Sequence, residues 1–316
     1  MPRDGWIMET LAIVLDEPRQ IGVRQVALRE PGPSDAVVTV HHTSISAGTE
    51  RLLWEGRMPA FPGMGYPLVP GYETVGRVEE AGPESPFSQG DALFVPGAHS
   101  FVDVRALFGG AAAQLVVRSD RVHRIDAADE EAALLALAAT AQHAIAVGGA
   151  PDLVIGHGVL GQLLARLTVA HGAPPPVVHE VNAARMASDG YPVVHPDADE
   201  RRDYARIVDA SGLHDVIDLS VKRLARSGTV TLAGFYGARM SFAFPAAFMK
   251  EARIVIAAEW NAEDLLAVRR LLDAGRLSLA GLVTHRATIA DAAAAYATAF
   301  TDPDCLKMVL NWRKDQ

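Results

Sequence analysis

Residues 153–164 read LVIGHGVLGQLL, an apolar run followed by a glycine-rich turn and a segment with leucines at helical spacing. Within it, Gly156, Gly158 and Gly161 form a G-x-G-x-x-G pattern. Between a strand and a helix, the first glycine permits a tight turn and the second lets the backbone approach a pyrophosphate, while the third lets helix and strand pack closely. The stretch therefore predicts a dinucleotide site on a doubly wound parallel sheet.

The residues after the turn extend this prediction. Val159 and Leu160 begin the predicted helix, whose first amides and dipole would face the anion. A second apolar run, PPVVHEV, contains Glu180, 24 residues after Gly156. A carboxylate there can bind both ribose hydroxyls and would repel a 2′-phosphate, so NAD is favoured over NADP. His157, inside the turn, is interpreted as a tolerated filler; the alternative to the whole site is a structural turn with Glu180 on the surface.

The organisation of the chain indicates two domains. A chain of 316 residues is too long for one ordinary core, and 49% apolar with 21% charged residues indicates a globular protein. From about residue 10 to 118, short apolar runs broken by glycine and proline predict a β-rich domain. From about residue 130, β-branched runs alternate with helical segments. We therefore predict an α/β protein with a dinucleotide-binding domain at 128–282 and a catalytic domain formed by 1–127 and 283–316.

Composition argues against several other classes of protein. Cys305 is the single cysteine, so neither an internal disulfide nor a multi-cysteine zinc cluster can form. A net charge of −9 argues against a nucleic-acid partner. The longest apolar-looking region, residues 133–150, contains polar residues and a Gly-Gly pair, which argues against a membrane span. The N-terminal residues lack a signal-peptide pattern, so a cytoplasmic location is expected, and Met8 could equally be the first residue.

Five motifs resemble the medium-chain dehydrogenase/reductase superfamily across nearly the whole chain. They are the glycine turn, SAGTE at 46–50, PLVPGYETVGRV at 67–78, GDALF at 90–94 and GGAAAQLVV at 109–117. The resemblance implies a GroES-like catalytic domain, a Rossmann domain, a nicotinamide cofactor and a homodimer formed through the cofactor domain.

Within the superfamily, the segments METLAIVLDEP and ISAGTERLLWEGRMP are most similar to dehydrogenases of bacteriochlorophyll biosynthesis. That similarity implies NAD-dependent oxidation of the 3-(1-hydroxyethyl) group of a tetrapyrrole, a chlorophyllide or bacteriochlorophyllide, to a 3-acetyl group. Two other functions stay open: a zinc-free quinone or enone reductase, and a catalytically silent member that binds NAD or pigment. A preference for NADPH would favour the reductase, although Glu180 speaks against it.

The metal ligands of zinc-dependent members are missing. The resemblance places Ala47 and Ala136 where those enzymes have cysteines, and Tyr72 where they have a histidine. Zinc requires nitrogen, sulfur or carboxylate donors, and alanine has none. We therefore expect chemistry without zinc, with Glu73 as the acid that remains beside the replaced ligand.

Oxidising a secondary alcohol still requires a group that accepts or relays the hydroxyl proton. Thr49 matches the hydroxyl residue that relays this proton in relatives, and it is the preferred catalytic residue. The Tyr72 phenol could hydrogen-bond the substrate oxygen, or the ring could only pack at the corner. Glu73 could act as a base if burial raises its pKa, or it could support the loop.

The remaining candidates are assigned by resemblance and by apolar character. Thr140 matches a residue that touches the nicotinamide, and Gly234 and Phe235 follow the strand that borders it. His143, one turn after Thr140, is expected to be structural. A flat tetrapyrrole requires a largely apolar pocket. The predicted pocket residues, some of which could instead be core or subunit contacts, are Glu50, Trp54, Met58, Phe61, Tyr66, His99 and Tyr236.

Overall fold

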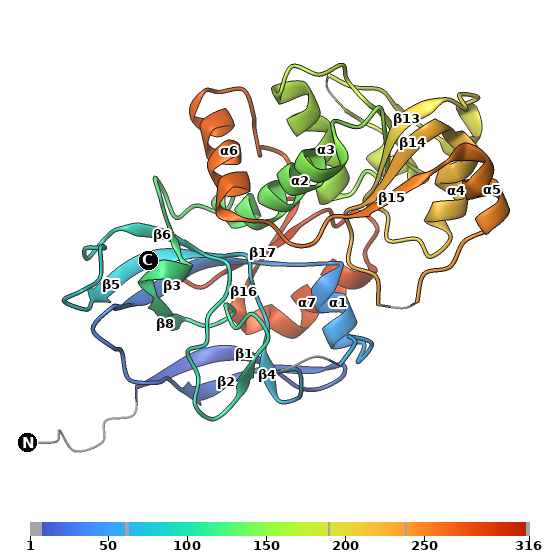
Figure 1. The fold of residues 1–316 in the computed structure, drawn as a ribbon. Coiled ribbons are helices and arrows are strands. Elements are labelled where there is room, and N and C mark those ends of the chain that lie inside the picture. The colour runs from blue at the N-terminus through green and yellow to red at the C-terminus, as the bar shows by residue number, and fades with distance from the viewer. Residues whose placement is uncertain (1–7, 61–62, 189, 238, 314–316) are drawn as a thin grey trace, which may run out of the picture. The chain divides into compact units, whose positions relative to one another are not determined.

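The computed structural model describes residues 8–60, 63–188, 190–237 and 239–313 (Figure 1). The chain divides into two compact units. One, here called the β-rich unit, ends at Leu134 and resumes at Gly281, and the other, the α/β unit, spans Leu135–Ala280. The predicted domain limits at 127/128 and 282/283 stay predictions, because compactness alone does not show which segments fold on their own.

The β-rich unit contains two sheets. The larger has the order β16-β17-β3-β5-β6-β9, with β8 paired to β3. Its strands are β3 (Asp35–Ile45), β5 (Thr74–Ala81), β6 (Ala92–Val95), β8 (Gln114–Arg118), β9 (His123–Ile125), β16 (His285–Thr288) and β17 (Met308–Asn311). The smaller sheet has the order β2-β1-β4-β7. Its strands are β1 (Glu9–Glu17), β2 (Gln20–Ala27), β4 (Leu68–Val69) and β7 (Arg105–Ala106).

The C-terminal tail is part of the β-rich unit. Strand β17 pairs antiparallel with β3, from Met308 opposite Ile45 to Asn311 opposite His42. Helix α7 (Ala292–Thr301) buries a stripe at helical spacing, consisting of Ala292, Ala295, Tyr296, Ala299 and Phe300. This stripe joins the main apolar core of the unit. The tail therefore places residues near 296 and 307 close to the end of β3, where α1 (Thr49–Trp54) begins.

The α/β unit is built on a parallel sheet with the order β12-β11-β10-β13-β14-β15. The strands are β10 (Leu153–Ile155), β11 (Val177–His179), β12 (Val193–Val194), β13 (Tyr204–Asp209), β14 (Leu224–Leu232) and β15 (Arg253–Ile256). Its helices are α2 (Leu135–Gly148), α3 (Val159–Ala170), α4 (Val216–Arg223), α5 (Phe244–Lys250) and α6 (Ala262–Asp273). Helices α2, α3 and α6 cover one face and α4 and α5 the other (Figure 1). The strand order reverses at β10, and ligands of such sheets bind at the carboxyl ends of the strands beside that reversal.

A buried polar network supports the short connection between β12 and β13. Residues 195–203 contain only a short 3-10 helix, η4 (Pro196–Ala198). The Asp199 carboxylate accepts hydrogen bonds from His179 (2.7 Å), Tyr204 (2.8 Å) and Arg223 (3.2 Å). These bonds fasten the connection to β11, β13 and α4. None of the described helices is both long and apolar enough to cross a bilayer.

Candidate active site

The glycine turn follows β10 directly and approaches the turn that follows β13. Gly156 has φ +95°, and a Cβ at this position would lie 3.0 Å from the backbone of Ser211. A Cβ on Gly161 would lie 1.8 Å from the Gly156 carbonyl oxygen. A Cβ on Gly158 would meet no atom of the described residues within 4 Å. The packing of the turn thus requires Gly156 and Gly161, whereas Gly158 faces open space, as a backbone that receives a ligand requires.

Helix α3 leaves its first amides available. Gly158 is its N-cap residue, and no side chain among the described residues caps the helix. The first N–H groups of a helix have no partner within the helix, and its dipole places partial positive charge there. The amides of Val159, Leu160 and Gly161 therefore form a suitable seat for a pyrophosphate.

Glu180 is buried, so the alternative that places it on the surface is wrong. Its side chain is 8% exposed. Its Oε2 accepts a hydrogen bond from the His157 amide (2.9 Å), and its Oε1 accepts from the amides of Val181 (2.7 Å) and Asn182 (2.8 Å). An ionised carboxylate offers about four acceptor positions, so about one is left for a ribose hydroxyl. The main contacts of Glu180 are therefore the three hydrogen bonds that stabilise the glycine turn and the segment after β11, which the sequence did not predict.

His157 connects the turn to the segment after β11. The ring is fully buried, with Nδ1 2.5 Å from the Arg185 carbonyl oxygen and Nε2 3.0 Å from the Tyr191 hydroxyl. Burial lowers the pKa of His157, which favours the neutral ring. Nδ1 then donates to the carbonyl and Nε2 accepts from the phenol. The histidine has a structural role here, more specific than a filler.

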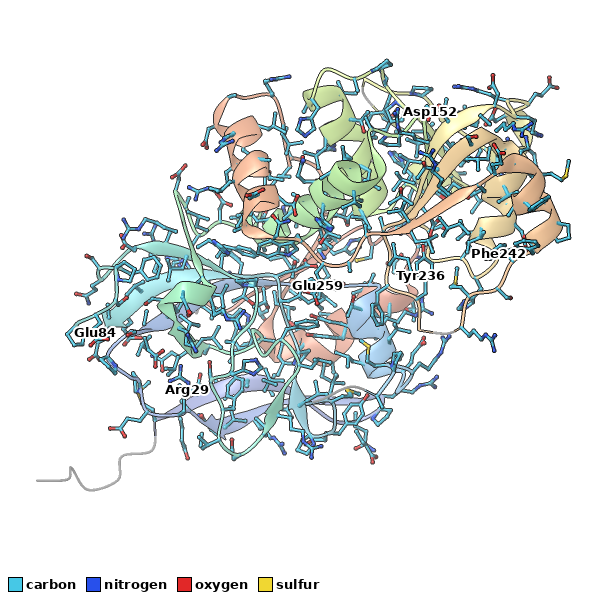
Figure 2. The ribbon with its side chains drawn as sticks, in the orientation of Figure 1. Arg29, Glu84, Asp152, Tyr236, Phe242 and Glu259 are labelled. Atoms are coloured by element: carbon cyan, nitrogen blue, oxygen red, sulfur yellow. The ribbon has the colours of Figure 1, made fainter. Side chains whose placement is uncertain are left out.

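The carboxyl ends of β13 and β14 carry a second buried contact. The Tyr236 hydroxyl donates to Asp209, which also accepts from the amides of Ser211 (3.0 Å) and Gly212 (3.3 Å). Burial raises the pKa of both Asp209 and Tyr236. Figure 2 shows Tyr236 on the segment that follows β14. The phenol, predicted for the substrate pocket, thus shapes the turn against which Gly156 packs.

The other cofactor candidates of the α/β unit differ in exposure. Phe235, which follows Gly234, is 54% exposed. The Thr140 hydroxyl donates to the carbonyl oxygen of Ala136, one turn earlier on α2. His143 pairs through Nδ1 with Asp264 (2.8 Å), a residue of the capping box of α6. That pairing fits the structural role expected of His143.

In the β-rich unit, a group of hydroxyls gathers at the start of α1. The Tyr72 hydroxyl lies 2.6 Å from Ser46 Oγ, and Thr49 also interacts with it. The Tyr72 ring packs edge-on against Phe108, with 4.9 Å between ring centroids. Burial and the nearby charge of Glu73 raise the pKa of Tyr72, so the phenol keeps its proton. Tyr72 is therefore equipped to donate a hydrogen bond and unsuited to act as a base.

Glu73 is fully buried and paired. The Lys307 ammonium lies 2.5 Å from its Oε2, and the Ser44 hydroxyl donates to the same oxygen. Lys307 is 3% exposed and also donates to the Ile45 carbonyl oxygen (3.1 Å). These two donors on one carboxyl oxygen link strand β3 to the residue before β17. The geometry favours the supporting role of Glu73 over the catalytic one.

Glu50 is the next residue of α1 after Thr49 and points into the same buried region. Its side chain is 0% exposed, and among the described residues neither of its carboxyl oxygens accepts a hydrogen bond of normal length and angle, although the Ser46 amide and Tyr296 face the carboxyl group. Burial, reinforced by the charge of Glu73, raises the pKa of Glu50 to about 8, while Lys307 and Tyr296 oppose the rise. Its predicted place in the pocket wall stays a prediction.

The apolar pocket candidates around α1 pack against one another. Met58 is buried with Leu53 and Leu68, and the Tyr66 hydroxyl donates to the Leu53 carbonyl oxygen. The Trp54 ring lies 5.5 Å from that of Phe300. His99 is exposed, and Phe61 lies outside the described residues. These contacts fit core packing as well as a pocket wall, so the pocket stays a prediction.

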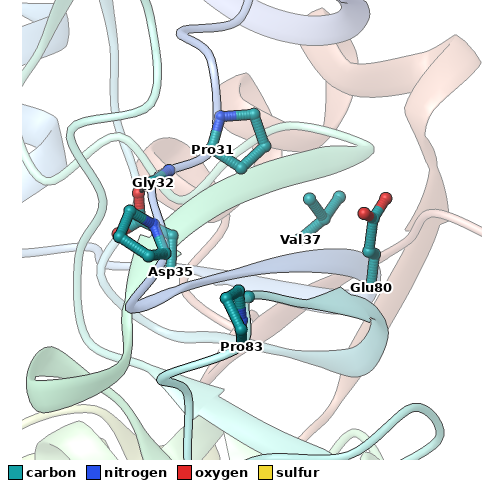
Figure 3. Close-up of a pocket in the computed structure, with 8 residues that line it drawn as sticks. Pro31, Gly32, Asp35, Val37, Glu80 and Pro83 are labelled. Carbon is teal, nitrogen blue, oxygen red and sulfur yellow. Dashed lines mark hydrogen bonds between the residues drawn. The ribbon is translucent and has the colours of Figure 1, made fainter.

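A small depression elsewhere on the β-rich unit contains none of these candidates (Figure 3). It encloses about 280 Å³ and is lined by Pro31, Gly32, Pro33, Asp35, Val37, Glu80, Gly82 and Pro83. The Arg29 guanidinium, 2.6 Å from Asp35, lowers the pKa of that carboxyl. The ion pair fixes the proline-rich turn, and the depression is too small for a tetrapyrrole.

Comparisons with known proteins give the family. The alcohol dehydrogenase GroES-like domain family matches residues 32–127. The chain is 54% identical to 2-desacetyl-2-hydroxyethyl bacteriochlorophyllide A dehydrogenase of Cereibacter sphaeroides over 315 residues, covering 97% of this chain and 99% of the relative. The enzyme of that name from Rhodobacter capsulatus is 54% identical over 311 residues, with the same coverage. The chain belongs to the bacteriochlorophyllide dehydrogenase family.

Solved structures agree on the fold. A putative zinc-binding dehydrogenase from Sinorhizobium meliloti bound to NADP has a TM-score of 0.79 at 19% identity, covering 96% of this chain and 99% of that one. An Escherichia coli alcohol dehydrogenase complexed with NADH has a TM-score of 0.80 at 18% identity, with the same coverage. The predicted superfamily and the predicted fold class, a GroES-like β-rich domain with a Rossmann domain, are confirmed.

Residues of this family member do not fit a catalytic zinc ion. Ala47 and Ala136 offer no donor, and the Tyr72 phenol keeps its proton. Among residues 8–60, 63–188, 190–237 and 239–313, no three His, Cys, Asp or Glu side chains are arranged to hold a metal ion. Chemistry without zinc stays a prediction.

Sequence reasoning missed three residues of the buried region: Lys307, Tyr296 and Ser46. The sequence did indicate one thing about Lys307: it directly precedes the largely buried strand MVLN, so its side chain could be buried too. Tyr296 lies in an alanine-rich helix at the buried spacing. Ser46 was noticed only as part of the SAGTE motif, and nothing in that motif shows that its hydroxyl meets Tyr72.

Proposed function

We propose that the chain oxidises the 3-(1-hydroxyethyl) group of a chlorophyllide or bacteriochlorophyllide to a 3-acetyl group, with NAD as the hydride acceptor and without zinc. The proposal rests mainly on the 54% identity, over nearly the full length, to two enzymes named for a hydroxyethyl bacteriochlorophyllide. In this reaction the carbinol carbon loses a hydride and the hydroxyl loses a proton. The products are the ketone, the reduced cofactor and one proton.

A nicotinamide cofactor fits the α/β unit. When bound, it would accept the hydride from the carbinol carbon. Its pyrophosphate would lie against Gly158 and the free amides of Val159 and Leu160. The buried carboxylate of Glu180 supports NAD over NADP, because a 2′-phosphate beside it would meet a negative charge. Measured dissociation constants for both cofactors test this choice; tighter binding of NADP would overturn it.

The chain's own hydroxyls would handle the substrate oxygen. Because Tyr72 keeps its proton, it would stabilise negative charge on that oxygen by donating a hydrogen bond. Thr49, which interacts with the Tyr72 hydroxyl, would relay the alcohol proton: its oxygen would accept that proton while its own hydroxyl proton passes to water. Ser46 would hold Tyr72 in place, since the two hydroxyls are 2.6 Å apart. A Thr49→Ala variant with full activity would remove Thr49 from this scheme.

We also propose a homodimer formed through the α/β unit, in the cytoplasm. Strand β15 ends the sheet, and its outer edge has no strand partner in the described part of the chain. Exposed apolar side chains gather on and near it: Phe244, Phe248, Met249 and Ile256. An open apolar edge of this kind is usually covered, and two-fold pairing with a second copy would cover it. Sedimentation analysis tests the dimer; a monomer at micromolar concentration would contradict it.

The experiment that tests the activity is direct. Purified protein is mixed with NAD and a 3-(1-hydroxyethyl) bacteriochlorophyllide, and both NADH and the pigment spectrum are followed. We expect NADH to form together with a red-shifted pigment. A folded sample that binds NAD but forms no NADH would refute the activity and favour a silent, pigment-binding member of the family.

A further inference from the structure

Two carboxyl groups and one amine share a fully enclosed region of the β-rich unit. Glu50 and Glu73 are 0% exposed, and Lys307 is 3% exposed. They come from three separate segments: Glu50 from α1, Glu73 from the segment before β5, and Lys307 from the residue before β17. Tyr296 of α7 is buried against them. The region therefore contains two potential negative charges and one positive charge.

The hydrogen bonds in this region are unevenly distributed. Lys307 bonds to Glu73 Oε2 and to the Ile45 carbonyl oxygen, and Ser44 also donates to Glu73 Oε2. By contrast, no hydrogen bond of normal length and angle reaches Glu73 Oε1 or either oxygen of Glu50 among the described residues, although the Ser46 amide and Tyr296 face the Glu50 carboxyl. Buried acceptors that lack a well-formed hydrogen bond are costly, because each has lost its bonds to water. A proton on Glu50 would turn one of these acceptors into a donor.

Charge balance points in the same direction. If both acids were ionised, a net charge of −1 would lie in a region closed to water, and a buried charge without a partner is strongly unfavourable. Protonation of one acid brings the net charge to zero. Lys307 and Ser44 both bond to Glu73 Oε2, whereas no well-formed bond of this kind reaches Glu50, so the proton belongs to Glu50.

We infer that Glu50 is a neutral, protonated acid at neutral pH and acts as a positioning residue for the Ser46–Tyr72 hydroxyl pair. The Glu50 amide donates to the Ser46 carbonyl oxygen (3.1 Å), and the Ser46 amide interacts with the Glu50 carboxyl group. Ser46 Oγ in turn contacts the Tyr72 hydroxyl. The part of this inference that concerns catalysis rests on the proposed function.

The groups that surround Glu50 determine how its ionisation affects Tyr72. The groups that face it are Glu73, Lys307, Tyr296 and the Ser46 amide, and burial with Glu73 raises its pKa to about 8. Above that pH a negative charge would appear near Tyr72, whose own ionisation that charge opposes. An ionised Glu50 would likewise repel negative charge on a substrate oxygen beside Tyr72. Alcohol oxidation should therefore stop rising, or fall, above about pH 8.

The first test needs no substrate. Infrared spectra of the wild type should contain a carboxylic acid C=O band at pH 6.5 that disappears as the pH rises through about 8. The band should be missing in Glu50→Gln and present in Glu30→Gln, a control at an exposed position of the same unit. Glu50→Gln keeps the shape of the neutral acid and should fold. An unchanged band in Glu50→Gln, or failure of that variant alone to fold, would overturn the inference.

The second test uses unfolding equilibria and also needs no substrate. A pKa raised in the folded state means that folding retains a proton that the unfolded chain releases above its ordinary pKa near 4.5. The folding equilibrium constant of the wild type, relative to Glu50→Gln, should therefore fall about tenfold per pH unit from about pH 5 to 8 and then level off. A ratio that does not change with pH would contradict a protonated Glu50.

The third test concerns the role in catalysis. In Glu50→Gln, the rate of alcohol oxidation should no longer level off or fall above about pH 8, as the rate of the wild type should. An unchanged pH profile would refute the positioning role. If the wild type has no activity while the infrared and unfolding results hold, the proposed function fails and the protonated Glu50 stands.

Discussion

Replacing Lys307 with methionine tests the ion pair at the centre of the β-rich unit. Lys307 is 3% exposed, and Glu73, its partner at 2.5 Å, is 0% exposed. Methionine fills a similar volume but leaves the Glu73 carboxyl buried without its charge partner and with Ser44 as its remaining donor, and the Ile45 carbonyl oxygen loses a bond. Breaking one side of a buried pair costs about 3–5 kcal/mol, so we expect the free energy of unfolding to fall by that amount.

Urea unfolding measures this loss. Trp54 and Trp312 lie in the β-rich unit and report its unfolding by fluorescence. The control is Arg118→Met, which breaks an exposed pair with Asp120 and should change the free energy of unfolding very little, because solvent screens that pair. Adding Glu73→Gln to Lys307→Met should restore about 2 kcal/mol, because the buried charge is then gone. A loss for Lys307→Met no larger than that of the control would refute the reasoning.

Three further predictions concern the cofactor and substrate groups. Gly158→Ala should leave the midpoint of thermal unfolding unchanged yet weaken NAD binding at least tenfold. Gly161→Ala should lower the midpoint of thermal unfolding, because its Cβ would lie 1.8 Å from the Gly156 carbonyl oxygen. If the two variants had equal effects on the midpoint and on NAD binding, the assignment of Gly158 to the cofactor and of Gly161 to packing would be contradicted. Tyr72→Phe keeps the packing on Phe108 and loses the hydroxyl, so kcat should fall about 100-fold with little change in the free energy of unfolding. An unchanged kcat would show that Tyr72 only packs. Tyr236→Phe removes the donor to buried Asp209 and should cost about 1–3 kcal/mol of unfolding free energy in urea titration; a change below about 0.5 kcal/mol would show that this bond does not stabilise the turn.

The glycine turn was predictable because its constraints are local. Gly156 and Gly161 are required by contacts with a neighbouring turn and with the start of α3, and both follow from a strand–turn–helix pattern. That Ala47 and Tyr72 stand where zinc-dependent members have metal ligands rests on motif resemblance, and it stays a prediction. The domain order was predictable as well, since strand and helix periodicities change along the chain.

The buried region was not predictable, because its contacts are long-range. Lys307 meets Glu73 only when β17 pairs with β3, more than 200 residues away in the sequence. Likewise, the three amide bonds of Glu180 depend on the path of the chain after β11. Spacing identified Glu180 as a possible ribose ligand, yet it could not show that most of its acceptor capacity is used by the protein itself.

The central claim is that this family member oxidises its alcohol substrate without a metal ion. The most direct measurement combines metal analysis with turnover of a 3-(1-hydroxyethyl) bacteriochlorophyllide by NAD, before and after treatment with a chelator. We predict less than one-tenth of a bound zinc ion per chain, on the order of background, and the same rate of NADH formation in both samples. One tightly bound zinc ion per chain, with activity lost on its removal and restored by its return, would contradict the account.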